Sequence, residues 1–247
     1  MARALAILLP PSEGKAAGGR GAPWRPGRGI LPELDEARAA VLAALDPEGT
    51  GVAAAPTRRA LDRYTGVLYR ELDAASLPTA ARRRLTSSTL IASGLWGLVG
   101  PNDPIPDYRL KMGAALAPLG RMATFWRPHL TAALQSRLAG RVVWDLLPGE
   151  HAAAWDPARV AVHRRITVRF VTAQDTTVSH WNKLLKGSLV RHIATTGLTD
   201  PRDLAAFDHP SGYRYDPDAT VVDGRHIAVV MRETYPAAAS AWALAQR

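Results

Sequence analysis

The stretch that decides the fold is RALAILLPPSEGK, residues 3–15. Residues 3–9 form an apolar run that Pro10-Pro11 ends, which is the pattern of a strand buried on both faces of a sheet. A polar turn that contains Ser12 and Lys15 follows directly. Because ligands of α/β proteins bind beyond the carboxyl ends of strands, the sequence predicts a candidate site at this turn.

This turn is not a Walker A loop, because the spacing Gly-x-x-x-x-Gly-Lys is missing. A surface turn with an isolated lysine is the alternative, and the spacing alone does not separate the two.

The rest of the chain alternates between strand and helix patterns. Loops are expected at 12–29 and at 94–108, where glycine and proline argue against regular structure. Buried strands are expected at 85–93, 141–147 and 166–171, and Asp223-Gly224 predicts a hairpin between 220–222 and 226–231. Helices are expected at 32–45, 124–138 and 179–196, and the helical pattern of 58–73 is interrupted at Tyr64-Thr65-Gly66.

These elements predict one α/β (α+β mixed) domain over residues 1–247, with a mixed β-sheet flanked by helices. The chain has 247 residues, of which 47% are hydrophobic, enough for a substantial core. It has no cysteine, which excludes disulfides and thiolate metal sites. The apolar run at 4–9 is too short to cross a bilayer and lacks a signal-peptide cleavage site, so we expect a cytoplasmic protein with no membrane partner.

The formal net charge is +9, which favours nucleic acid or phosphorylated ligands as partners. A solvated, arginine-rich surface explains the same charge equally well. Lysine is more informative, because only four of the 31 basic residues are lysines. Where this arginine-rich chain has a lysine, the position can require a property that arginine lacks. Lysine is a compact charge that can lose its proton when it is buried. The four lysines are Lys15, Lys111, Lys183 and Lys186.

Three further segments carry candidate ligand-binding residues. Ser93-Gly94 ends a predicted strand, and glycine there allows close approach of a backbone. Arg109 and Lys111 alternate, so they share one face of an extended segment. On the predicted helix after residue 179, lysines three residues apart share a face. That helix contributes Asn182, Lys183, Lys186 and Gly187, the last of which requires something to pack closely against its turn.

Glu150 follows the strand expected at 141–147 and could act as a base or orient a lysine. His151 lacks a second ligand at a metal-binding spacing, so no metal site and no cofactor are predicted. Ser12, Ser93 and Glu150 thus each follow a strand. If the carboxyl ends of those strands share one edge of the sheet, these residues line one cleft.

Taken together, these motifs resemble the YaaA peroxide-stress protein family. The resemblance covers nearly the whole chain, and its most specific part runs from Ser93-Gly94-Leu95-Trp96-Gly97 to Tyr108-Arg109-Leu110-Lys111-Met112-Gly113. The other matching elements are Lys15 in an altered first turn, Tyr64-Thr65-Gly66, Phe125-Trp126, Glu150, the helix with Lys183, Gly187 and Arg191, and Ser211-Gly212-Tyr213. The residues around Lys15 and at 145–149 depart from the family pattern, which indicates a divergent branch.

The resemblance implies a mixed α/β fold with a positively charged cleft and a role in peroxide stress. It also implies DNA binding through a helix-hairpin-helix-like element, for which the segment 191–207 is the candidate. Arg191, Gly197 and Arg202 are then the expected nucleic-acid-binding residues, with backbone N–H groups facing phosphate.

The alternative is an enzyme that acts on a small anionic substrate, a nucleotide or an amino-acid-derived metabolite. In that case Lys15 or Lys183 is the base or nucleophile, Glu150 is its partner and Arg109 holds the anion. Ser12 and Tyr64 complete the candidate catalytic set.

Overall fold

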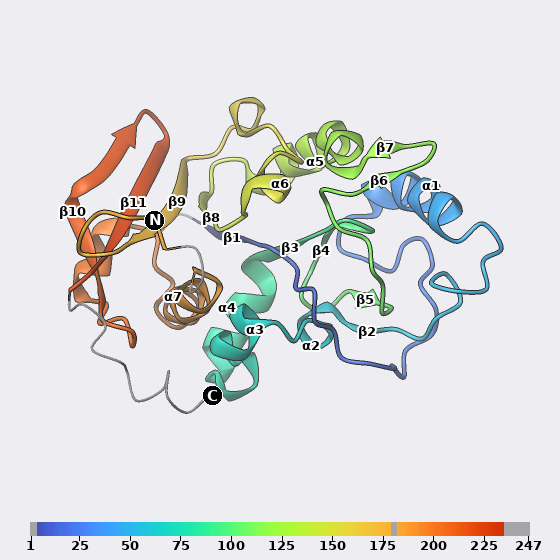
Figure 1. Cartoon of the computed structure of the whole chain (residues 1–247), viewed down its shortest axis with the longest axis horizontal. Helices are drawn as coiled ribbons and strands as arrows, with labels where there is room; N and C mark the ends of the chain where they lie inside the picture. The colour runs from blue at the N-terminus through green and yellow to red at the C-terminus, as the bar shows by residue number, and fades with distance from the viewer. Residues whose placement is uncertain (1–3, 179–181, 235–247) are drawn as a thin grey trace.

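The structure is a computed structural model that describes residues 4–178 and 182–234. Its centre is a seven-stranded sheet with the order β10-β11-β9-β8-β1-β3-β4, which runs across the molecule in Figure 1. The strands of this sheet are β1 (Leu5–Leu9), β3 (Thr89–Ser93), β4 (Gly97–Val99), β8 (Val142–Asp145), β9 (Arg164–Val171), β10 (Tyr213–Asp223) and β11 (His226–Glu233). The predicted mixed sheet is therefore confirmed.

The strand β1 lies near the middle of this sheet. It pairs in parallel with β3 on one side and with β8 on the other, and all five of its residues are buried. The pairs β8–β9 and β9–β11 are also parallel, whereas β4 and β10 join the sheet antiparallel at its two edges. The apolar run thus correctly predicted a strand that is covered on both faces. Within the described residues, this strand begins at Leu5.

Helices cover the sheet. Figure 1 shows α3, α4 and α7 together on one side, and α5 and α6 on the other. The helices are α1 (Asp35–Leu45), α2 (Ala60–Arg63), α3 (Val67–Leu72), α4 (Thr79–Ser88), α5 (Met122–Leu138), α6 (Gly149–Ala152) and α7 (Asn182–Thr196), with 3-10 turns η1 (Pro32–Leu34), η2 (Ala74–Ser76), η3 (Pro157–Arg159) and η4 (Pro201–Ala206). Two small two-stranded sheets pair β2 (Arg58–Arg59) with β5 (Pro104–Ile105), and β6 (Ala115–Leu116) with β7 (Gly120–Arg121). None of the helices in the described ranges is long and apolar enough to span a bilayer.

Two sequence predictions of secondary structure were wrong. The first four residues of the expected strand 85–93 belong to α4, which the sequence analysis did not identify. Leu85 is fully buried in that helix, so its apolar character serves helix packing instead of a strand. The turn-rich segment 94–108 contains β4 and β5, because glycine and proline here lie at the ends of short strands. The hairpin at Asp223-Gly224 is confirmed, with a longer first strand.

The chain order places a topological switch point between β1 and β8. After β1 the chain adds β3 and β4 on one side, and it then returns to add β8 and β9 on the other. In open α/β sheets, ligands bind in the crevice outside the carboxyl ends of the strands at such a point. The loops after Leu9, Ser93 and Asp145 leave the same edge of the sheet, as expected for parallel strands.

Candidate functional site

Lys15 is the central cation at the carboxyl edge of β1. Its Nζ lies 4.4 Å from the ring centroid of Tyr108 and 5.8 Å from that of Tyr64. It donates a hydrogen bond to the carbonyl oxygen of Ser12 at 3.1 Å. Among the described residues, no carboxylate lies within ion-pair distance of this ammonium. Burial lowers the pKa of Lys15 below its ordinary value, because desolvation disfavours the charged form.

A chain of buried hydroxyl groups lies beneath Lys15. The phenol oxygens of Tyr64 and Tyr108 are 2.7 Å apart, and Ser93 Oγ is 2.7 Å from the Tyr108 oxygen. Burial raises the pKa of Tyr108 to about 12, so this phenol stays protonated at neutral pH. The chain joins the end of β3 to the Tyr64-Thr65-Gly66 turn, whose backbone also forms a β-bridge with Lys15. These contacts hold Lys15 against two aromatic rings.

Glu13 links Lys15 to cations from two other segments. Its Oε1 is 2.8 Å from Lys111 Nζ, and both side chains are exposed. The ion pair with Lys111 lowers the pKa of Glu13 most, and Lys183 and Lys15 lower it further. Arg109 acts in turn on Lys15, where its positive charge adds to the lowering of the lysine pKa. The three cations Lys15, Arg109 and Lys183, which are far apart in the chain, therefore act on one electrostatic neighbourhood.

Helix α6 places Glu150 and His151 beside this neighbourhood. A Cβ on Gly113 would collide with the carboxylate of Glu150, so glycine at 113 lets this side chain lie on the loop backbone. Glu150 acts electrostatically on Lys111, and both Glu150 and Lys183 act on His151. The residue predicted as a base thus acts on one of the predicted cations, Lys111.

Lys186 lies deeper, on α7. Its Nζ donates to the carbonyl oxygen of Leu146 at 3.0 Å, and burial lowers its pKa. Asp145, at the end of β8, is buried and pairs with Arg165 at 2.7 Å. Lys186 therefore anchors the start of the β8–α6 loop to α7, and its predicted role in ligand binding stays a prediction.

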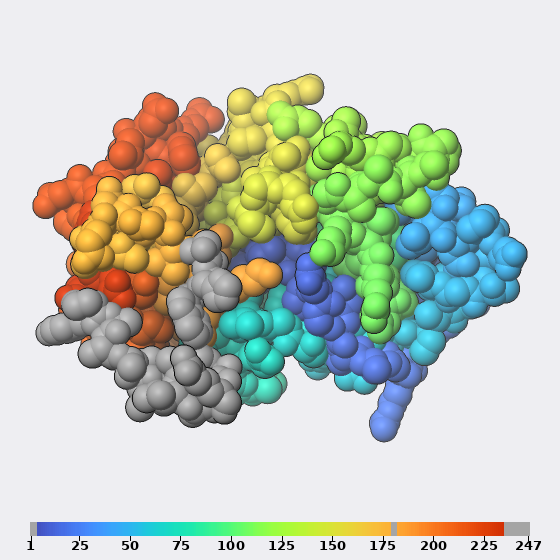
Figure 2. All heavy atoms as spheres, viewed as in Figure 1, coloured from blue at the N-terminus to red at the C-terminus, as the bar shows by residue number. Residues whose placement is uncertain are grey.

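The surface is hollowed where these segments meet. Figure 2 shows a depression in the middle of this face, with blue residues of the N-terminal segment at its floor. Yellow residues around α6, green residues of the loop before β6 and orange residues near the start of α7 surround it. The charged side chains of this neighbourhood are of both signs, because carboxylates lie among the cations. Its charged residues are Lys15, Arg109, Lys111 and Lys183 against Glu13, Asp107 and Glu150.

Three predicted site residues have structural contacts of their own. Ser12 Oγ donates to Gly14 O at 2.5 Å and accepts from Gly66 N at 3.1 Å, which fixes the turn before Lys15. A Cβ on Gly94 would collide with the backbone at Leu110 and Lys111, so the chain itself makes the close approach that was expected of a ligand. A Cβ on Gly187 would lie 2.6 Å from a carbonyl oxygen of α3, which explains glycine within α7.

The segment 191–207 is built differently. Arg191 donates to the carbonyl oxygens of Leu72 and Asp73 at 2.9 and 3.0 Å, and Arg202 forms an ion pair with Asp200 at 2.5 Å. Gly197 ends α7 at φ +76°, and its N–H donates to Ile193 O within the chain. η4, a six-residue 3-10 helix, follows α7. The cations expected to contact nucleic acid thus already have protein partners, and their role in DNA binding stays a prediction.

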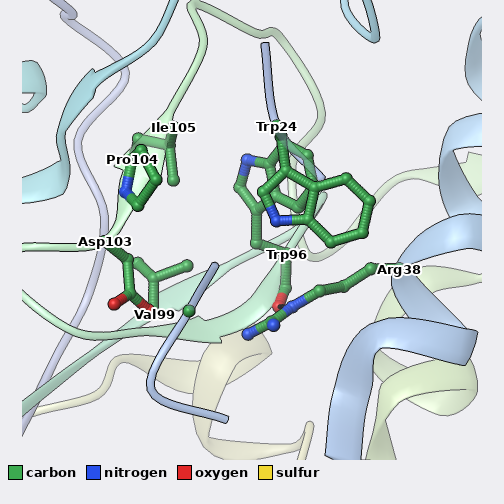
Figure 3. Close-up of a pocket in the computed structure, with 8 residues that line it drawn as sticks. Trp24, Arg38, Trp96, Val99, Asp103, Pro104 and Ile105 are labelled. Carbon is green, nitrogen blue, oxygen red and sulfur yellow. Dashed lines mark hydrogen bonds between the residues drawn. The ribbon is translucent and has the colours of Figure 1, made fainter. Parts of the chain in front are cut away.

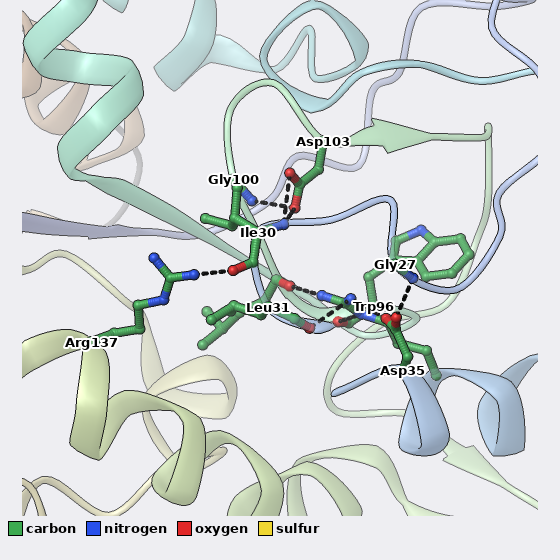
Figure 4. A network of polar contacts seen from close by, with 10 residues as sticks. Gly27, Ile30, Leu31, Asp35, Trp96, Gly100, Asp103 and Arg137 are labelled. Carbon is green, nitrogen blue, oxygen red and sulfur yellow. Dashed lines mark hydrogen bonds and ion pairs between the residues drawn. The ribbon is translucent and has the colours of Figure 1, made fainter. Parts of the chain in front are cut away.

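A small cavity of about 10 Å³ lies away from this site, and Figure 3 shows residues that line it, among them Trp24, Trp96 and Ile105. It has room for about one water molecule. Beside it, Arg38 is fully buried and donates to carbonyl oxygens on both sides of the cavity. Figure 4 shows the same loop held by Asp103, which accepts from the N–H groups of Ile30 and Gly100. This network fixes the loop 27–31 to β4 and is structural.

A larger hollow of about 490 Å³ lies at the amino-terminal ends of β8 and β9, next to the β10–β11 hairpin. The arginines that line it already have partners, because Arg164 donates to Gly224 O at 2.8 Å and Arg202 pairs with Asp200. We therefore place the candidate site at the opposite edge, around Lys15. In the described ranges, no group of three His, Asp or Glu side chains is placed to hold a metal ion.

The sequence analysis missed three residues that the structure brings to the site: Glu13, Tyr108 and His151. Tyr108 had a usable signal, because it precedes the alternating Arg109 and Lys111. Glu13 is part of the turn that contains Ser12 and Lys15, but nothing in the sequence pairs it with Lys111, which lies far along the chain.

Comparisons with known proteins agree on one family. Residues 29–219 match the family model described as peroxide stress protein YaaA. A UPF0246 protein of Streptomyces coelicolor is 40% identical over 246 residues, covering 89% of this chain and 95% of that protein. A UPF0246 protein of Corynebacterium glutamicum is 35% identical over 213 residues, covering 76% and 84%. The chain therefore belongs to the YaaA peroxide stress protein family.

Proposed function

We propose that this chain serves in the response to peroxide as an enzyme that acts on a small anionic substrate at the Lys15 site. The family description supports the peroxide role. The observation that carries the enzymatic part is Lys15 itself, a half-buried lysine held against aromatic rings with a lowered pKa. A lysine whose charged form is disfavoured in this way is suited to act as a base or nucleophile.

The other residues take roles that follow from their positions. Lys183 and Arg109 attract the anion toward Lys15. Glu150, held on the Gly113 backbone, is the second acid–base group. The hydroxyl chain of Tyr64, Tyr108 and Ser93 fixes Lys15 and keeps a protonated phenol next to it.

The alternation of charge favours a small ligand over duplex DNA at this site. A groove for the phosphate backbone gains affinity from cations that are free to replace counterions. Here Glu13 already neutralises Lys111, and Glu150 and Asp107 lie in the same neighbourhood. A compact ligand can contact the cations and avoid the carboxylates, which an extended polyanion cannot do.

DNA binding is the second candidate, and the net charge of +9 favours it. It predicts affinity for duplex DNA that falls steeply as salt rises. Fluorescence anisotropy with a labelled duplex at low and high salt tests it, and lack of binding at low salt would exclude it.

The enzymatic proposal is tested by peroxide survival of bacteria that lack their own family member and carry this chain. Lys15→Arg keeps the charge but cannot donate or accept the proton in the same way, so we expect survival to fall to that of the empty strain. Arg214→Lys keeps the charge at an exposed pair with Asp208 on the edge strand β10, outside the site, and is the matched control, with survival unchanged. Full survival with Lys15→Arg would contradict lysine chemistry.

A further inference from the structure

His151 has a buried ring nitrogen with no hydrogen-bond partner. The side chain is 10% exposed, and its Nδ1 is fully buried without a partner among the described residues. The nearest carboxylate oxygen, Glu150 Oε1, is 3.8 Å from Nδ1, too far for a hydrogen bond. Buried polar atoms are almost always satisfied, so an exception next to a candidate site needs an explanation.

A predicted cation lies in the same electrostatic neighbourhood as this nitrogen. Lys183, in the first turn of α7, acts electrostatically on His151. Burial lowers the pKa of His151, so its ring is neutral near pH 7 and one ring nitrogen can accept a hydrogen bond. An unused acceptor thus lies near the cation predicted to attract the ligand.

The surrounding charges have both signs. Lys15 and Lys183 favour an anionic group, whereas Glu13 and Glu150 favour a cationic one. A ligand with negative charge alone leaves the His151 acceptor unsatisfied and gives Glu13 and Glu150 no partner of opposite charge. A ligand that also carries N–H donors satisfies both sets of groups.

We infer that the ligand is a zwitterion of the α-amino-acid class, whose carboxylate faces Lys15 and Lys183 and whose ammonium donates to His151 Nδ1. This inference rests on the proposed function, since it names the substrate class for the same site. It also assigns His151 to ligand recognition.

The test is isothermal titration calorimetry on the full chain with a panel of free α-amino acids, their N-acetyl derivatives and the corresponding desamino carboxylic acids. We expect at least one free amino acid to bind. Acetylation removes the positive charge and two N–H donors, so we expect its N-acetyl and desamino analogues to bind at least about tenfold more weakly.

His151→Phe keeps the ring volume and removes the acceptor. We expect it to weaken binding of the free amino acid about tenfold and to leave the weak binding of the desamino analogue unchanged. The unfolding midpoint checks that the variant folds. If it does not fold, the comparison of ligand analogues on the wild-type chain still decides the inference.

Two results would overturn the inference. One is equal affinity for the free, N-acetylated and desamino forms, and the other is no binding by any free amino acid at millimolar concentration. Neither result bears on the survival test of Lys15→Arg. The inferred substrate class can therefore be wrong while the proposed enzymatic function is still supported. Unchanged survival with Lys15→Arg would instead remove the proposed function.

Discussion

The two basic regions of this protein use their cations in opposite ways. At the Lys15 site, the ammonium of Lys15 lies against aromatic rings, carboxylates lie in the same neighbourhood, and the Nδ1 of His151 has no partner among the described residues. In the segment 191–207, the guanidinium of Arg191 donates to two backbone carbonyls at the end of α3. The first arrangement leaves cations for a ligand, whereas the second uses them to hold the fold.

Arginine and lysine divide these tasks for a chemical reason. The planar guanidinium has five donors and can bridge several carbonyl oxygens at once. Arg84 does so at the end of α7, where it donates to Ala194 O and Thr195 O. Lysine is a point charge whose pKa responds to burial. The lowered pKa of Lys15 and Lys186 fits that difference.

The largest effect is expected from Gly94→Ala, which tests how the site is built. The added methyl collides with the backbone at Leu110 and Lys111, which is not free to move, so we expect a loss of about 2–3 kcal/mol in the free energy of unfolding. Chemical denaturation measures it. Gly149→Ala is the control, because nothing lies within 4 Å of a Cβ there. Equal stability of the two variants would show that the backbone at Leu110 and Lys111 does not pack against Gly94.

Arg191→Ala probes the other region. It leaves two carbonyl oxygens without their donor, and we expect a loss of about 1–2 kcal/mol in the free energy of unfolding. Peroxide survival at a temperature where the variant stays folded should not change. Arg202→Ala, at an exposed pair, serves as the control with an unchanged midpoint. If Arg191→Ala instead abolishes DNA binding and leaves the free energy of unfolding unchanged, the claim that this region uses its cations to hold the fold is contradicted.

Lys15→Met should change the pH dependence of stability. Burial lowers the folded-state pKa of Lys15 below 10.5, so between that lowered value and 10.5 the unfolded chain binds more protons. The free energy of unfolding of the wild type therefore rises with pH through this window. At pH values below the window, Lys15 is charged in the folded state and burial of that charge lowers the free energy of unfolding by its full amount. We expect Lys15→Met to be more stable than the wild type at neutral pH, with the difference vanishing as pH approaches 10.5. Denaturation curves across that range measure it, and a constant difference would contradict the sign.

The smallest effect is expected at the Glu13–Lys111 pair. Both side chains are exposed, so solvent and salt screen their attraction. Glu13→Gln should shift the denaturation midpoint slightly at low salt and not at all at high salt. A large shift that persists in high salt would mean that this pair is part of the fold and not only of the site surface.

Much of the fold follows from local pattern. The apolar run before Pro10 predicted the central strand, and Asp223-Gly224 predicted the hairpin, because a buried strand and a two-residue turn need few distant partners. Helix α4 was missed because Leu85 reads equally well as strand or helix, and the choice depends on packing against α7.

The site was predicted in part. That Ser12, Ser93 and Glu150 follow parallel strands was sufficient to expect one shared edge, since such strands end together. The hydrogen bond between Tyr64 and Tyr108 was not predictable, because it joins side chains 44 positions apart. The unpartnered Nδ1 of His151 was not predictable either, because it depends on which side chains pack around the ring. Conversely, Gly94 was read as a ligand contact, but a neighbouring segment of the chain occupies that space.

The central claim is tested most directly by titrating the lysines themselves. The chain has only four, so NMR of protein labelled at lysine Cε resolves each titration, with assignment by single Lys→Arg variants. We predict that Lys15 titrates below 10.5, because it is buried against Tyr108, and that Lys111 titrates above 10.5, because of Glu13. Coincident titrations of Lys15 and Lys111 at the ordinary value would contradict the account.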